Sequence, residues 1–155
     1  IANGKTWRIV PSFSYIAFNV KDDFSDLPNR TTVAITAVKI QPDGKAVLFG
    51  QSLYWAPRSM PDPAGLKVLR PGLELGEVKK GRFEPAHALA LWLKTCASVQ
   101  DYAPDSPEMA AYVHGDVVPS DKKGWTLVTA GGLSIGWGKG DGKILKNHYP
   151  KGLRR

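Results

Sequence analysis

Cysteine is nearly absent from this sequence of 155 residues, and the single Cys96 excludes an internal disulfide and a cysteine-rich zinc site. Long apolar runs are also missing, since no segment approaches the roughly 18 apolar residues that a membrane helix needs. The start IANGKTWRIV has neither the basic residues nor the apolar run of a signal peptide. These absences indicate a cytoplasmic protein without a membrane segment. Because the sequence begins at Ile1 and not at Met, we expect it to be a piece of a longer chain.

Recognisable catalytic or metal-binding patterns are lacking as well. The three histidines are far apart and show no metal-ligand spacing. Cys96 has apolar neighbours and is interpreted as a small buried side chain, not as a nucleophile. The glycine-rich string GGLSIGWGKGDG is followed by no Lys-Ser/Thr pair and no helix, so it is a weak candidate for a phosphate loop. We therefore predict that this chain has no catalytic residue, no metal site and no cofactor of its own.

Acidic residues are scarce at the C-terminal end, so the charge is segregated along the chain. The formal net charge is +7 at pH 7, and residues 122–155 contain eight Lys or Arg but only one acid, Asp141. Residues 83–121 contain one basic and six acidic residues. Such segregation is typical of nucleic-acid binding, because each neutralised phosphate releases counterions. A solvated basic edge is the alternative interpretation.

The first third of the sequence favours β-structure. TWRIV, FSYIAFNV, TTVAITAVKI and KAVLFG are rich in Val, Ile, Thr and aromatic residues, and QPDG at residues 41–44 suits a hairpin turn. Residues 56–65 contain three Pro and a Gly. This segment is the best candidate for a boundary, so we predict one domain at residues 1–65 and another at residues 66–155.

The second domain is predicted to mix strands with two helices. Residues 66–82 indicate one or two strands bent at glycines, and residues 85–98 predict an apolar, buried helix that starts at Pro85. A short helix is expected at residues 106–115, with Ser106 as the N-terminal cap and Gly115 as the stop. Residues 124–139 predict a hairpin that turns at Gly131-Gly132. This order fits a small barrel of five or six strands with one or two helices.

Three stretches together resemble the C-terminal region of bacterial Nol/Nop/Sun-family RNA cytosine-5 methyltransferases of the RsmF type. They are LKVLRPGLELGEVKKGRFEPAHALALWL (66–93), GWTLVTAGGLSIGWGK (124–139) and LKNHYPKGLRR (145–155), in the same order as in that family. The resemblance is strong over residues 46–155. Two positions depart from the family pattern: His114 stands where the family commonly has Arg, and Gly140 stands where an Arg usually follows Lys139.

The resemblance implies an α+β, mostly β fold: a small β-rich connector followed by a PUA-like pseudobarrel with one main helix and one short helix. S-adenosylmethionine and paired Pro-Cys motifs belong to a catalytic domain that precedes both modules in the family. This chain has no Pro-Cys pair. The expected function is therefore non-catalytic: a monomer that binds ribosomal RNA and positions it for its own N-terminal methyltransferase domain. The alternative is a module that braces the methyltransferase domain, with only incidental RNA contact.

The candidate RNA-binding residues lie in two basic groups, one before the main predicted helix and one at the C-terminal end. We expect the two groups to meet on one face of the barrel. Tyr149 suits stacking on a base or packing on the barrel, and Asn147 can donate to phosphates or base edges. The complete set is Lys79, Lys80, Arg82, His114, Lys139, Lys143, Lys146, Asn147, Tyr149, Lys151, Arg154 and Arg155.

Overall fold

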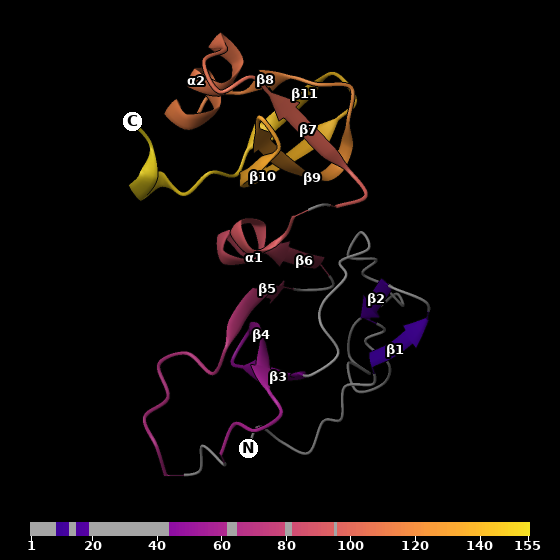
Figure 1. The fold of residues 1–155 in the computed structure, drawn as a ribbon, viewed down its shortest axis with the longest axis vertical. Coiled ribbons are helices and arrows are strands. Elements are labelled where there is room, and N and C mark those ends of the chain that lie inside the picture. The colour runs from indigo at the N-terminus through magenta and orange to yellow at the C-terminus, as the bar shows by residue number, and fades with distance from the viewer. Residues whose placement is uncertain (1–8, 13–14, 19–43, 62–64, 80–81, 95) are drawn as a thin grey trace. The chain divides into compact units, whose positions relative to one another are not determined.

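A computed structural model describes residues 9–12, 15–18, 44–61, 65–79, 82–94 and 96–155 (Figure 1). The chain divides into two compact units, Ile1–Leu89 and Ala90–Arg155. No helix within the described ranges is both long and apolar enough to cross a bilayer.

The first unit is built from antiparallel strands. Two strands form an antiparallel sheet of their own, β1 (Ile9–Ser12) and β2 (Tyr15–Phe18). Four more form a sheet in the order β3-β4-β5-β6, namely β3 (Gly44–Phe49), β4 (Ser52–Pro57), β5 (Leu73–Lys79) and β6 (Arg82–Pro85). The strands expected at TWRIV, FSYIAFNV, KAVLFG and residues 66–82 are thus confirmed in type, while residues 31–40 and most of the QPDG turn lie outside the described residues.

The proline-rich segment at residues 56–65 begins with the last two residues of β4, inside the first unit. Strand β4 pairs with β5, with Trp55 opposite Leu73 and Ser52 opposite Glu77. The expected boundary between residues 65 and 66 therefore falls within one sheet, and the two compact units separate at residues 89 and 90 instead. Proline and glycine disfavour regular strand pairing. They do not reveal whether the strands on either side belong to one sheet.

The main predicted helix is much shorter than expected. Helix α1 (His87–Trp92) has six residues, and Pro85 ends β6 instead of starting the helix. The prediction of a helix over residues 85–98 was wrong in its bounds: the helix ends at Trp92, and strand β7 (Val99–Tyr102) follows and pairs with a distant strand, a contact that local helix propensity does not encode. Nor is the helix buried all round, since Leu91 is 57% and Trp92 is 41% exposed.

The second unit is a curled five-stranded sheet in the order β7-β9-β10-β11-β8 (Figure 1). Strand β7 runs parallel to β9, and every other pair is antiparallel. The hairpin of β9 and β10 turns at Gly131-Gly132, as predicted. Both glycines have positive φ, 55° and 82°, as a tight hairpin turn requires. The remaining strands are β8 (Val118–Pro119), β9 (Lys123–Ala130), β10 (Leu133–Asp141) and β11 (Ile144–Asn147).

Helix α2 (Pro107–His114) begins and ends where the sequence predicts. The Ser106 hydroxyl accepts a hydrogen bond from the Met109 N–H at 3.2 Å, and Pro107 occupies the first turn. Gly115 has a φ of 110° and donates its N–H to carbonyls of the last turn. These are local capping interactions, which depend on few residues.

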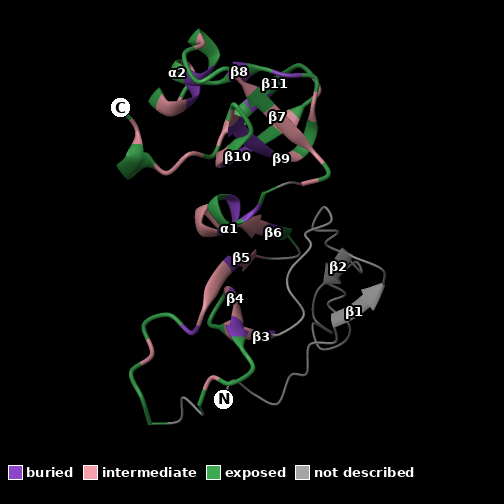
Figure 2. Ribbon diagram, in the orientation of Figure 1, coloured by how far each residue is buried: buried purple, intermediate pink, exposed green. Residues whose placement is uncertain are grey.

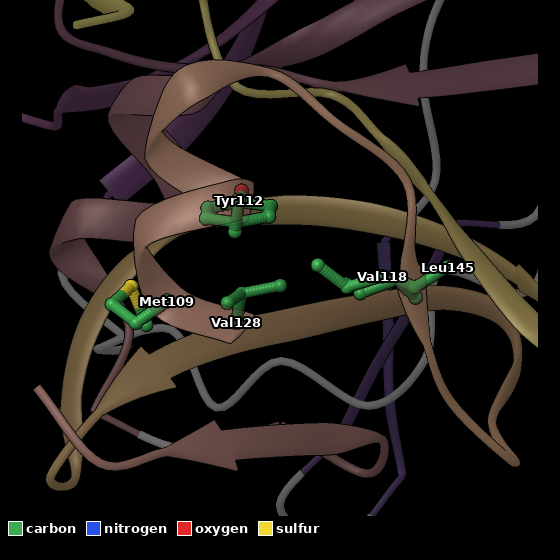
Figure 3. Close-up of a cluster of buried hydrophobic side chains, with 5 residues drawn as sticks. All are labelled: Met109, Tyr112, Val118, Val128 and Leu145. Atoms are coloured by element: carbon green, nitrogen blue, oxygen red, sulfur yellow. The ribbon is translucent and has the colours of Figure 1, made fainter. Parts of the chain in front are cut away.

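The core of the second unit lies between α2 and the inner face of the curled sheet (Figures 2 and 3). Its buried side chains are Met109, Tyr112, Val118, Val128 and Leu145. Tyr112 is fully buried, and its hydroxyl donates to the Trp137 carbonyl at 2.9 Å. Burial raises the pKa of Tyr112 far above its ordinary value, so the hydroxyl remains a neutral donor. The expected α+β, mostly β fold with a small barrel is confirmed.

Candidate nucleic-acid interface

A row of three side chains crosses the outer face of the second unit's sheet. Lys139 on β10 lies opposite Trp125 on β9 and opposite Lys146 on β11. Directly opposed residues of antiparallel strands point to the same face, so all three share one surface. The Lys139 Nζ lies 5.5 Å from the centroid of the Trp125 ring. The His148 ring lies 4.5 Å from the same ring, at an interplanar angle of 67°. We call Trp125, Lys139, Lys146 and His148 the Trp125 cluster.

At this end of the sheet the two lysines face outward because the opposite face of their strands is packed. Leu145 precedes Lys146 on β11, points into the core and is fully buried. Gly138 precedes Lys139 on β10, and a Cβ at that glycine would collide with the Leu145 side chain. Alternation along each strand then directs both lysines outward. In the structure Lys139, Lys146 and His148 are exposed, whereas Trp125 is half-buried.

The two lysines of the cluster are not neutralised locally. In the described part of the chain, neither Lys139 nor Lys146 forms an ion pair with a carboxylate. The nearby Asp141 accepts hydrogen bonds from the N–H groups of Lys143 and Ile144, both at 3.0 Å. These bonds, first that from Ile144, lower the pKa of Asp141, and the charge of Lys146 adds a smaller effect. The Asp141 carboxylate is therefore committed to its own turn.

The basic group in the first unit is, by contrast, neutralised. The Lys79 Nζ lies 2.6 Å from a carboxylate oxygen of Glu77 and 2.7 Å from one of Glu84. Arg82 Nε lies 3.1 Å from the other oxygen of Glu84. The hydrogen bond to Glu77, and then that to Glu84, raises the pKa of Lys79. Lys80 is outside the described residues.

Sequence reasoning missed this neutralisation because Glu77 and Glu84 are brought together only by the pairing of β5 with β6. Lys79 and Arg82 belong to the first unit, and the basic residues of the C-terminal end belong to the second. The expectation that the two groups share a face stays a prediction.

The side-chain amide of Asn147, which RNA contact would require, is already hydrogen-bonded within the domain. Its side-chain nitrogen donates to the carbonyls of Tyr112 at 2.7 Å and Asp116 at 3.0 Å. Its side-chain oxygen accepts from the Tyr149 N–H at 2.8 Å. An amide nitrogen has two protons, so both are already used within the domain.

The end of the chain folds back on α2. The Tyr149 ring is half-buried and lies 5.6 Å from the Tyr112 ring. Arg154 donates to the Tyr149 carbonyl from Nε at 3.3 Å and from Nη2 at 3.1 Å. Its side chain covers Gly115, where a Cβ would lie 2.6 Å from Arg154 Cδ. Tyr149 and Arg154 are therefore fixed against the domain and are not parts of a loose tail.

The other candidates lie on the surface of the second unit. His114 Nδ1 is 2.9 Å from the Asp116 carboxylate, on the exposed end of α2. Lys143 is exposed in the turn between β10 and β11. Lys151 is exposed in the short 3-10 helix η1 (Lys151–Leu153), and Arg155 is exposed after it.

Sequence reasoning did not select Trp125 or His148. A regular hairpin that turns at Gly131-Gly132 would place Gly138 opposite Trp125. A bulge between Ser134 and Gly136 shifts the register by one residue and places Lys139 there. The spacing of basic and aromatic residues in the sequence could have suggested Trp125 and His148. It does not show that Trp125 shares a face of the sheet with Lys139.

A curled, mostly β sheet with two helices has the architecture of a PUA-like pseudobarrel. Comparison with known families agrees with this class: residues 99–155 match the methyltransferase RsmF PUA domain. Residues 34–93 match the RsmF rRNA methyltransferase first C-terminal domain. The two matches together cover most of the chain, so the chain belongs to the C-terminal region of RsmF-type rRNA methyltransferases. The resemblance inferred from the sequence is confirmed.

Proposed function

We propose that this chain is the non-catalytic, RNA-binding part of an S-adenosylmethionine-dependent rRNA cytosine-5 methyltransferase. It holds structured ribosomal RNA in position for the catalytic domain of the same protein. The observation that supports this function is the Trp125 cluster, in which the exposed Lys139 lies over the Trp125 ring and the exposed Lys146 lies opposite Lys139 on the next strand, neither with a carboxylate partner in the described chain.

The chemistry of this surface fits a polyanion that carries aromatic bases. Each phosphate that a lysine neutralises releases condensed counterions, so binding strengthens as salt is lowered. Aromatic side chains can also stack on bases, whereas a polyanion without aromatic rings could not make this contact.

The test is the salt dependence of binding to a ribosomal RNA fragment. The double substitution Lys139→Ala with Lys146→Ala should weaken binding and reduce the slope of log K against log salt by roughly two. The matched control is Arg58→Ala with Lys67→Ala, which removes the same charge from exposed positions of the first unit. An unchanged slope in the first variant, or an equal loss in the control, would contradict the assignment of the RNA-binding surface.

A second candidate function is intramolecular bracing of the methyltransferase domain. It is favoured by helix α1, where Leu91 is 57% and Trp92 is 41% exposed although both side chains are large and apolar. Quenching of fluorescence by acrylamide tests this function, with Trp92→Phe used to isolate the signal of Trp92. Bracing predicts ready quenching in this chain and protection in the full-length methyltransferase. Equal quenching in both proteins would contradict bracing.

We also expect the chain to be monomeric and to bind no S-adenosylmethionine. A stable dimer in analytical ultracentrifugation would contradict the first expectation. A one-site isotherm in a calorimetric titration with S-adenosylmethionine would contradict the second and would overturn the non-catalytic assignment.

A further inference from the structure

We propose that the Trp125 cluster is a subsite for one unpaired nucleotide of RNA. The base stacks on the Trp125 indole, and Lys139 and Lys146 contact the neighbouring phosphates. This inference rests on the proposed RNA-binding function and adds the form of RNA that the surface recognises.

The Trp125 ring is held in place before any ligand arrives. The Trp137 ring lies 6.5 Å away at an interplanar angle of 78°, and Trp137 itself is only 4% exposed. The His148 ring supports Trp125 from another side at 4.5 Å. A half-buried ring with two aromatic neighbours loses little conformational freedom when a base stacks on it.

Lys139 occupies the position that a base would take. Its Nζ lies over the indole at 5.5 Å. A cation–π contact at an exposed site is weak, so the flexible ammonium can leave the ring when a base arrives. The displaced ammonium remains close enough to reach the phosphate of the stacked nucleotide.

The two lysines themselves point to an anionic ligand. Lys139 and Lys146 are direct cross-strand partners, and like charges in this arrangement destabilise a sheet. Lys79 and Arg82 are also direct cross-strand partners, but there Glu77 and Glu84 form ion pairs that offset the repulsion of the two positive charges. At the Trp125 cluster no ion pair in the described residues offers that compensation. A phosphate between the lysines would remove the repulsion.

The aromatic component favours unpaired RNA over a duplex. In an A-form duplex the base faces are stacked on one another, and proteins contact mainly phosphates and 2′-hydroxyls. A base in a loop or a bulge exposes its face and can stack on an aromatic side chain. Lysines alone would serve either form, whereas Trp125 adds binding energy only for the unpaired form.

Fluorescence anisotropy with two probes tests the subsite: a 12-nucleotide oligoadenylate and an RNA duplex of 12 base pairs. Trp125→Leu should weaken oligoadenylate binding about tenfold, within the range of base–aromatic stacking, and leave the salt slope unchanged. Duplex binding should stay the same. Trp92→Leu is the matched control, since it removes another partly exposed indole, and it should change neither affinity.

Trp125→Phe provides a second variant if Trp125→Leu lowers the melting temperature. Oligoadenylate should quench the tryptophan fluorescence of the wild-type chain, and most of this quenching should be lost in Trp125→Phe. If Trp125→Leu binds oligoadenylate as tightly as the wild-type chain, or if Trp125→Phe is quenched to the same extent, the subsite is overturned. RNA binding through the lysines would not be contradicted by either result. If the wild-type chain binds neither probe, the proposed function fails together with the subsite.

Discussion

Substitution of Asn147 tests most sharply whether its side chain serves folding or RNA binding. Replacement by Ala removes three hydrogen bonds, two donated to the carbonyls of Tyr112 and Asp116 and one accepted from the Tyr149 N–H. The two donated bonds join the end of β11 to the last turn of α2 and to the residue after Gly115. Each intramolecular hydrogen bond contributes about 0.5–1.5 kcal/mol net, so the substitution should lower the free energy of unfolding by about 2–4 kcal/mol.

For a domain of this size, such a loss should lower the melting temperature by at least about 10 °C. Circular dichroism and urea denaturation measure the effect. The matched control is Lys146→Ala, one residue earlier on the same strand but exposed on the outer face, where the change should stay within about 0.5 kcal/mol.

RNA affinity should show the opposite ranking. At a temperature where both variants are folded, Asn147→Ala should bind RNA as the wild-type chain does, and Lys146→Ala should bind it more weakly. If Asn147→Ala keeps its melting temperature but loses RNA affinity, the structural role that we assign to its amide is wrong.

Three further substitutions examine the second unit. Gly115→Ala should cost about 1–2 kcal/mol in urea denaturation, because φ is 110° there and the new Cβ would meet Arg154; an unchanged midpoint would refute this. Tyr112→Phe should lose about 0.5–1.5 kcal/mol with its buried hydrogen bond, and a more stable variant would argue against that bond. The pKa of Asp101 is lowered, mainly by the Thr129 hydroxyl, so its contribution is present above the ordinary value of 3.8 and is lost as pH falls further. Acid titration of Asp101→Asn should show a shallower loss of stability below about pH 4, and a curve identical to wild type would contradict this.

Local features of the fold could be predicted from the sequence. Ser106, Gly115 and the Gly131-Gly132 turn were predicted correctly because caps and tight turns depend on hydrogen bonds and backbone conformations of adjacent residues. The mostly β composition and the outward lysines of the C-terminal end followed from residue type and charge in the same way. The family resemblance, carried by three long stretches, was also confirmed.

Tertiary pairing decided where local patterns were ambiguous. Residues 86–94 are rich in Ala and Leu, but the helix ends at Trp92, and β7 begins at Val99 and pairs with the distant β9. The proline-rich segment predicted a domain boundary, yet β4 and β5 pair with each other across it in one sheet. Such contacts join residues that are distant in sequence, and no local propensity encodes them.

The candidate site depended most on structure. Basic residues in the sequence do not show which of them are neutralised, and the pairing of β5 with β6 provides Lys79 with two carboxylates while Lys139 and Lys146 receive none in the described chain. The bulge in β10 has the largest consequence. A shift of one residue exchanges the two faces of a strand, so this bulge alone places Lys139, and not Gly138, beside Trp125.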